Sequence, residues 1–312
     1  MTTTTPTSDP ATTTVVTSPR KLAWARRRRA ARRVCRELYR DKAGFTGFAV
    51  LLIFCIIAIA APLIEPRSAL RAVEARNNPV LAPPSAEFPL GTDDLGRSVL
   101  AQLVWGARVS LYIGLLATVV AVVIGSVIGL VAGYARGWLS SALLAIDDFF
   151  LVIPFLPLAI VLAVILGRSP TTLALVIGVT SWAGSARLVR AQVLTLSQRG
   201  YVERARALGA GGRHTVTHHV LPGVAPLIIA NATLIVPGAI LAESTLSFLG
   251  FGDRFAPSWG KMLDGAQSSG AITLNAWWYY LPPGLCIIAV VLAFTLFGRA
   301  LERIVDPRLA GR

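Results

Sequence analysis

The chain has 312 residues, of which 54% are hydrophobic and 15% charged, and its mean hydropathy is +0.63. Soluble chains carry about 25% charged residues, so this composition argues against an ordinary soluble enzyme and favours a polytopic membrane protein. The net charge of +14 is concentrated in residues 20–42, where eleven Lys or Arg directly precede the first apolar run. That position favours contact with membrane lipid over nucleic acid, because no nucleic-acid-binding module accompanies the charges.

The N-terminal part of the chain divides into two segments before the first apolar run. Residues 1–19 contain nine threonines without periodicity, so we expect a disordered tail. Residues 20–42 are rich in Ala and Arg, which predicts a basic helix along the membrane surface. The three cysteines, Cys35, Cys55 and Cys286, show neither a disulfide framework nor metal-ligand spacing, and we expect them to serve packing.

Six later segments are apolar and long enough, or nearly long enough, to cross about 30 Å of hydrocarbon as helices. The fourth is the weakest, and we expect it to continue past Arg187 as a helix that leaves the bilayer. The six predicted spans are Phe45–Ile64, Leu111–Tyr134, Phe149–Leu166, Thr172–Ser185, Ala225–Leu241 and Tyr280–Phe297.

The distribution of basic residues predicts the orientation of these spans. With the N-terminus in the cytoplasm, 22 of the 30 Lys and Arg residues fall on the cytoplasmic side. We therefore predict an all-α, multi-pass protein of the cytoplasmic (inner) membrane with six transmembrane helices and both termini cytoplasmic. Its expected parts are the first span with an outer loop (43–110), a five-span core (111–304) that includes a cytoplasmic loop (187–224), and a cytoplasmic tail (305–312).

Small and polar residues inside the spans predict where helices meet. Gly125, Gly129 and Gly133 recur every four residues and would let another helix backbone approach one face. Pro154 and Pro157 in the third span, and Pro237–Gly238 in the fifth, predict kinks.

The fifth span also carries three polar residues that are costly to expose to lipid. Asn231, Thr233 and Glu243 should therefore face the helix bundle, either in packed hydrogen bonds or along a wet path. Near the start of the third span, Asp147 and Asp148 favour a place at the membrane interface over a buried proton relay.

The cytoplasmic segment "YVERARALGAGGRHTVTHHVLP" (Tyr201–Pro222) is too long and too charged for a simple connection. As a helix it places Val202, Ala205, Leu208 and Gly209 on one small, smooth face. Glu203 in the first turn complements the helix dipole, and Gly209 and Gly211–Gly212 should end the helix. Such a face suits insertion of the helix into a groove of another protein.

The same segment holds all three histidines, which raises the question of a metal site. His214, His218 and His219 have no acidic or cysteine partner nearby in an Arg-rich stretch, so we predict no metal and no catalytic residue.

Glu203, Ala205 and Gly209, followed after nine residues by "HVLP" (His219–Pro222), resemble the EAA loop of ATP-binding-cassette (ABC) importer permeases. In that loop Glu-Ala-Ala is followed after three residues by Gly, and after nine more by Ile-x-Leu-Pro. Arg204 and His219 depart from the pattern in the manner of the peptide branch. "FPLGTDDLGRSVLAQLVWGARVSL" (88–111), "ESTLSFLGFG" (243–252) with "SWG" (258–260), and "DPRL" (306–309) are similar to C-type subunits of the dipeptide, oligopeptide and nickel permeases.

This resemblance implies the type I ABC importer permease fold and a set of partners. They are a paralogous B-type permease subunit, two ABC ATPase subunits that bind the cytoplasmic loops, and an extracytoplasmic substrate-binding protein. The chain has no Walker A sequence, so ATP and Mg²⁺ would be bound by the ATPases and no cofactor by this subunit. The resemblance assigns ATPase docking to a coupling helix, and the exit from the loop to Leu221 and Pro222. The coupling-helix residues are Tyr201, Val202, Glu203, Arg204, Ala205, Arg206, Ala207, Leu208 and Gly209.

The resemblance favours di- and oligopeptides as substrates, with nickel chelates, haem or glutathione as alternatives. The first outer loop, Glu65–Arg108, holds five basic and five acidic residues, so we expect a near-neutral surface for the binding protein. A secondary transporter is a remote alternative. Such a protein needs ionisable residues deep in several spans, whereas in this chain they cluster at the ends of the spans. An intramembrane enzyme is disfavoured as well, because it would need a nucleophile and base, or metal ligands, deep in the membrane, and all three histidines lie in the loop.

Overall fold

Helices make up almost all of the regular structure in this protein. The computed structural model describes residues 36–253 and 255–305, and within these ranges the only β pairing is an isolated bridge between Thr92 and Ser98. The Thr-rich tail, residues 20–35 with Cys35, and the final residues 306–312 lie outside the described part, so the expectations for them stay predictions.

The described residues contain four helices that are long and apolar enough to cross a membrane, and six spans result if each of two bent helix pairs counts as one. The all-α class and the membrane-spanning architecture are thereby confirmed. The four long elements are α2 (Lys42–Ile64), α3 (Val99–Tyr134), the run Gly212–Phe248 that contains α10 (Leu221–Phe248), and α12 (Trp277–Val305). The bent pairs are α4 (Trp138–Val152) with α5 (Phe155–Leu166), and α6 (Pro170–Thr180) with α7 (Ala183–Ser197).

The kink predicted at Pro154 in the third span, Phe149–Leu166, is confirmed, and it is sharp enough to divide the span between two helices. The chain turns by 93° between α4 and α5, because Pro154 disfavours a helical conformation at the residue before it. Ile153 accordingly has extended backbone angles, and Pro154 becomes the N-cap of α5. The fourth span continues as a helix past Arg187, as predicted, and ends at Ser197 after a 46° bend.

Two spans extend well beyond their apolar windows. α3 has 36 residues, about 54 Å at 1.5 Å per residue, and so exceeds the hydrocarbon thickness. It begins twelve residues before the predicted start at Leu111, because the Ser98 hydroxyl accepts a hydrogen bond from the Ala101 amide and caps the helix. α10 continues through Pro226 and Pro237 without interruption.

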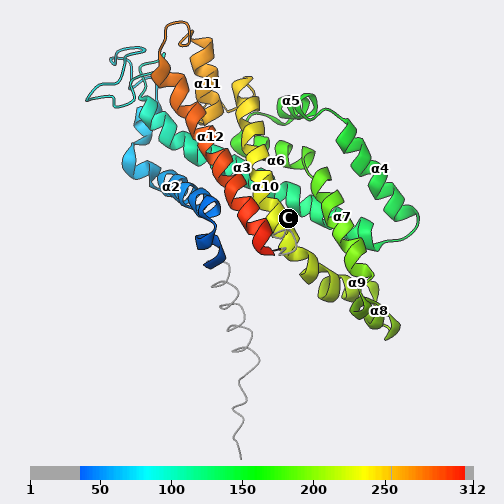
Figure 1. Cartoon of the computed structure of the whole chain (residues 1–312). Helices are drawn as coiled ribbons and strands as arrows, with labels where there is room; N and C mark the ends of the chain where they lie inside the picture. The colour runs from blue at the N-terminus through cyan, green and yellow to red at the C-terminus, as the bar shows by residue number, and fades with distance from the viewer. Residues whose placement is uncertain (1–35, 254, 306–312) are drawn as a thin grey trace, which may run out of the picture.

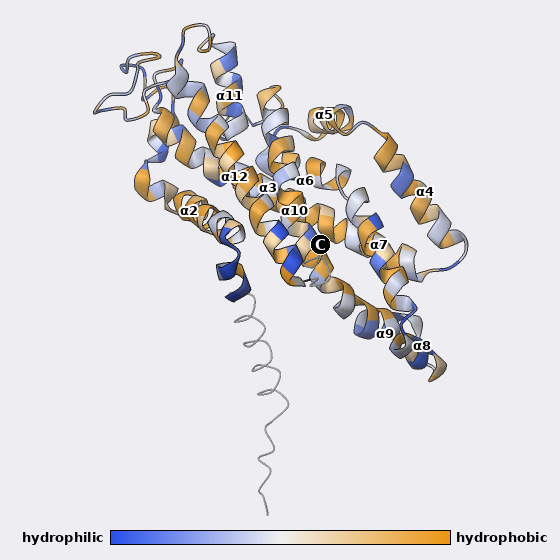
Figure 2. Cartoon of the chain, in the orientation of Figure 1, coloured by the Kyte–Doolittle hydropathy of each residue, from blue (hydrophilic) through white to orange (hydrophobic). Residues whose placement is uncertain are grey.

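The long helices pack in two groups around α3 (Figure 1). One core lies between the N-terminal part of α3 and the helices α2, α10, α11 (Trp259–Ser268) and α12. A second core lies between the middle of α3 and the helices α5, α6 and α10. α4 lies at the edge, against α3 and α7. The outward faces of the long helices remain apolar (Figure 2), as expected for surfaces that meet lipid or other transmembrane chains.

Both described ends of the chain lie at the same end of the bundle. The Arg303 guanidinium is 3.1 Å from the Asp41 carboxylate, so the start of α2 adjoins the end of α12. The segment after α7 lies toward this end, whereas α11 and the connection between α2 and α3 lie at the opposite end, which we call the outer end (Figure 1). This arrangement agrees with two termini on one side of a membrane, and which side they occupy stays a prediction.

Candidate functional site

The predicted coupling segment forms a short helix, α8 (Gly200–Ala207), at the end of the bundle opposite to the outer end. Glu203 lies in its first turn, and Arg204 and Arg206 lie in its last turn. The side-chain charges at both ends therefore interact favourably with the helix dipole. The helix ends in a Schellman motif: the Gly209 amide donates to the Arg206 carbonyl, and the Ala210 amide donates to the Ala205 carbonyl.

Gly209 is required by this helix end. Its φ is +86°, in the left-handed region that favours glycine, and an added Cβ would meet no atom within 4 Å. The cost of a substitution here is therefore backbone strain and not a clash within this chain. Gly212, which we predicted to help end the helix, instead begins the next helix, α9 (Gly212–Thr215).

Two residues of the predicted contact face of α8, Val202 and Leu208, lie in opposite environments. Val202 is fully buried in a cluster of valines: Val189 and Val193 of α7, Val220 just before α10, and Val224 in α10. It therefore anchors α8 to its own protein and is not available to a partner, which corrects the expectation that Val202 shares an outward face with Leu208. Leu208 is 89% exposed, because the helix ends there and the chain turns away.

The surface that α8 presents outward consists of both polar and apolar groups. Ala205 and Arg206 are half-buried, and the Arg206 guanidinium lies 4.7 Å from the centre of the Tyr134 ring at the end of α3. The exposed members are Tyr201, Glu203, Arg204, Ala207, Leu208 and Gly209.

The connection from α8 to α10, within the predicted cytoplasmic loop 187–224, is itself helical. α9 continues through a π-helical turn, Val216–Val220, into α10, whose first turn holds half-buried Leu221 and exposed Pro222. The rings of His214 and His218 stack at 4.2 Å within this connection. Among the described residues, no group of three or more His, Cys, Asp or Glu side chains is placed to hold a metal ion.

α7 leads directly into α8 and is packed tightly on the glycine face of α3. A Cβ added at Gly125 would lie 2.7 Å from the Trp182 carbonyl oxygen, and one at Gly129 would lie 2.5 Å from the Ala186 carbonyl oxygen. At Gly133 the nearest atom would be Val193 Cβ, at 2.8 Å. The two helices therefore pack closely at three positions over about two helical turns, and a side chain at any of these positions would force them apart.

The three polar residues of the fifth span have different environments. The Asn231 amide donates to the Ser185 hydroxyl of α7 at 2.7 Å, and the Thr233 hydroxyl donates to the Ala230 carbonyl. Glu243 is fully buried and accepts hydrogen bonds from Ser110, Ser244 and Ser247. Glu243 thus has the environment of a packed hydrogen-bonding residue, whereas Asn231 and Thr233 remain half-buried.

An ion cluster that the sequence did not predict joins α4 to α7. Arg187 donates through Nε to the buried carboxylate of Asp147 at 2.9 Å, and through an NH2 group to the exposed carboxylate of Asp148. The expected interface placement fits Asp148, but Asp147 is only 2% exposed. The six residues between the end of α6 and Arg187 include no carboxylate, and Asp147 and Asp148 lie 40 and 39 residues before Arg187, so no local pattern could have revealed the pair.

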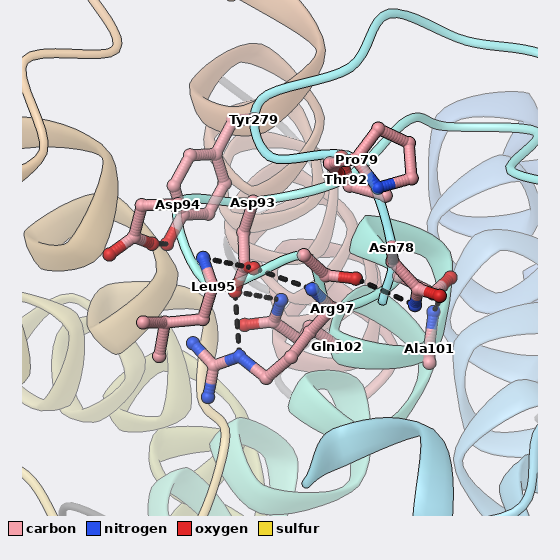
Figure 3. Close-up of polar contacts among 12 residues, drawn as sticks. Asn78, Pro79, Thr92, Asp93, Asp94, Leu95, Arg97, Ala101, Gln102 and Tyr279 are labelled. Carbon is pink, nitrogen blue, oxygen red and sulfur yellow. Dashed lines mark hydrogen bonds and ion pairs between the residues drawn. The ribbon is translucent and has the colours of Figure 1, made fainter. Parts of the chain in front are cut away.

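The motif "GTDDLGRS" (Gly91–Ser98) forms a hydrogen-bonded polar turn at the outer end (Figure 3). The fully buried Asp93 carboxylate accepts hydrogen bonds from the Leu95 amide, from the Arg97 amide and Nε, and from the Gln102 side chain, at 2.7–2.9 Å. One carboxylate thus closes the turn and holds it on the first turns of α3.

The same motif is tied to α12, far away in sequence. The Tyr279 hydroxyl donates to Asp94 at 3.1 Å (Figure 3). The Trp278 indole donates to the Thr92 carbonyl at 3.3 Å. Gly91, with φ +70°, lies under Trp278, and a Cβ there would be 2.5 Å from the Ala82 carbonyl oxygen. The motif therefore fixes the outer connection to both neighbouring helices.

Comparison with known proteins gives consistent results. A family model described as "binding-protein-dependent transport system inner membrane component" matches residues 125–311, and one described as "N-terminal TM domain of oligopeptide transport permease C" matches residues 30–84. The "dipeptide transport system permease protein DppC" of Escherichia coli K12 is 39% identical over 277 residues, 86% of this chain and 90% of that protein.

Two further relatives show similar agreement over most of their length. The protein of the same name from Bacillus subtilis is 36% identical over 276 residues, covering 88% of this chain and 84% of the relative. The "di/tripeptide transport system permease protein DppC" of Pseudomonas aeruginosa is 35% identical over 269 residues, covering 84% and 86% of the two chains.

Proposed function

The chain belongs to the family of binding-protein-dependent transport system inner membrane components, and from this premise we propose that it carries di- and oligopeptides inward as one of two paired permease subunits. Membership makes it a multi-pass inner-membrane permease subunit of an ABC importer, which works with ATPase and substrate-binding partners. The peptide substrate, the paralogous B-type subunit and the role of α8 are the proposed elements.

The peptide substrate is supported by the names of the relatives, since three similar proteins from three bacteria are named as dipeptide or di/tripeptide permeases. The oligopeptide permease match over residues 30–84 supports the same class. Nickel chelates, haem and glutathione are the alternatives for this branch. Uptake of a labelled dipeptide, with each alternative tested as a competitor, distinguishes them.

The observation that carries the coupling role is the combination of an anchored inner face and an exposed end on α8. Val202 fixes the helix to α7 and α10, and Leu208 extends into solvent at the helix end. A helix held in this way can enter a groove of an ATPase and transfer displacement, because it cannot swing independently of the helices behind it.

The route of that displacement follows the tightly packed elements. Only Gln198 and Arg199 separate α7 from α8, and α7 touches the α3 backbone at the glycine face. Closure of the two ATPases on ATP would move α8, and α7 and α3 would follow as one unit. ATP hydrolysis itself is assigned to the partner subunits, which would bind ATP and Mg²⁺.

Leu208→Asp tests the docking role. Burying a leucine side chain contributes about 1.5–3 kcal/mol, so its loss, with a desolvated carboxylate added, lowers ATPase affinity by at least about tenfold. Leu208→Met is the matched control, because it keeps an apolar side chain of similar volume.

The measurements are ATPase co-purification and dipeptide uptake at equal membrane levels of the permease. We expect both to fall in Leu208→Asp and to be retained in Leu208→Met. Normal co-purification in Leu208→Asp would show that α8 does not enter the ATPase. Uptake that persists without ATP, driven by an ion gradient alone, would instead indicate the secondary transporter.

A further inference from the structure

A cavity of about 900 Å³ lies at the outer end of α3, and the basic residues of the first outer loop gather in it. Among the described residues, those that line it include four arginines and no carboxylate: Arg67, Arg71, Arg97 and Arg108. The expectation of a near-neutral surface over Glu65–Arg108 is therefore wrong at this place. The linear sequence mixes the two signs of charge, but the fold leaves more arginines than carboxylates at the cavity: Asp93 is fully buried, where it pairs with Arg97 and accepts from Gln102.

Two of the four arginines are not neutralised by a carboxylate. Arg97 is paired with Asp93 at 2.7 Å, and Arg71 lies 3.6 Å from Glu74. Arg67 and Arg108 instead lie 4.9 and 5.8 Å from the centre of the Trp105 ring, and neither has a carboxylate within ion-pair distance in residues 36–253 and 255–305. The cavity thus keeps a net positive charge.

Trp105 fixes the position of this charge. Its ring is only 5% exposed, and its indole donates to the Glu65 carbonyl at 3.1 Å. The ring therefore forms a rigid floor under Arg67 and Arg108. Tryptophan and arginine together are typical of the level of lipid headgroups at the membrane interface.

An exposed apolar stripe continues from the cavity along the same face of α3. After Arg108 and Tyr112, which line the cavity, come Leu115, Val119 and Val123, each 44–57% exposed. Their spacing of three or four residues places them on one side of the helix. The stripe runs from the cavity toward the middle of the span, so the charged cavity lies above an apolar track.

We propose that this cavity binds the phosphate headgroup of an anionic phospholipid from the leaflet at the outer end, with an acyl chain along the α3 stripe. The arginines complement the phosphate charge, and the stripe complements the acyl chain. A soluble anion would use only the cavity, and an apolar protein surface would use only the stripe. A phospholipid is the occupant that uses both.

The test is lipid retention by the intact importer. The complex is purified with wild-type or Arg67→Gln/Arg108→Gln permease, and bound phosphatidylglycerol and phosphatidylcholine are titrated by native mass spectrometry. Each basic residue at a membrane surface contributes about fivefold in affinity, so the double variant should bind phosphatidylglycerol about 25-fold more weakly. Arg76→Gln is the control, because Arg76 is exposed on the same connection but does not line the cavity.

A photoreactive benzophenone side chain at Val119 identifies what covers the stripe. We expect cross-links to phospholipid, which decrease in the double arginine variant and not in the Arg76 control. Cross-links to the second permease subunit would overturn the proposal and assign this face to the subunit interface. Equal phosphatidylglycerol binding by wild-type and double-variant complexes that assemble normally would overturn it as well, as would equal affinity for phosphatidylcholine in wild type.

Discussion

Gly129 lies in the contact between α3 and α7, and Gly129→Ala tests whether this contact holds the helices in place. The added Cβ would lie 2.5 Å from the Ala186 carbonyl oxygen and 2.8 Å from Val189 Cβ. An ordinary contact begins at 3.4 Å, so α7 has to shift by about 0.9 Å, because a backbone oxygen in a close-packed contact cannot rotate away.

The expected cost of this shift is about 1–3 kcal/mol, the usual range for overpacking one small group. Gly129→Leu should cost more and lower the amount of assembled complex, because its larger side chain has to occupy the same contact. Gly184→Ala is the matched control: it changes the same residue type in α7, where a Cβ would meet nothing within 4 Å. In that helix the alanine should be neutral or stabilising by about 0.4–1 kcal/mol.

The assay is the temperature at which half of the detergent-solubilised complex loses its assembled peak in size-exclusion chromatography. Gly129→Ala should lower this temperature, and Gly184→Ala should leave it unchanged or raise it. Wild-type assembly temperature and uptake in both Gly129 variants would refute the reasoning, since they would show that α7 separates from α3 without cost.

Three further changes test other parts of the structure. Reporters inserted near Val80 and within Ala207–Arg213 should read as extracytoplasmic and cytoplasmic, respectively, and an external signal from the second site would reverse the predicted orientation. Arg187→Gln should lower the temperature at which the assembled complex is lost, because it leaves the buried Asp147 carboxylate without its cation; adding Asp147→Asn should recover part of the loss. Asp93→Ala should make the outer connection accessible to protease at concentrations that leave wild type intact, because it removes four hydrogen bonds at once.

The parts of the fold that could be predicted are those encoded within one helix. Apolar runs predicted the spans, and the glycines spaced four residues apart predicted the face of α3 that packs closely on another helix. Gly209 predicted the end of α8, where a positive φ is needed. Each of these depends on residues a few positions apart.

The parts that could not be predicted depend on residues brought together from distant helices. Val202 looked like a member of an outward face, and only the positions of α7 and α10 show that it is buried. Likewise, Arg187 and its partner Asp147 are 40 residues apart in the sequence, and Glu243 and its hydrogen-bond donor Ser110 are 133 residues apart. The near-neutral charge of the outer loop concealed a positive cavity for the same reason.

The ties between the outer motif and α12 also set an order for biosynthesis. Asp94 and Tyr279 are 185 residues apart, so at a synthesis rate of about 5–20 residues per second the hydrogen bond has to wait roughly 10–40 s for its donor to be made. During that interval Gly91 lacks its tryptophan cover and the Thr92 carbonyl lacks the indole donor. The ties to α12 can therefore form only after the last helix has been synthesised, whereas the hydrogen bonds of Asp93 can close the turn as soon as the first turns of α3 have been made.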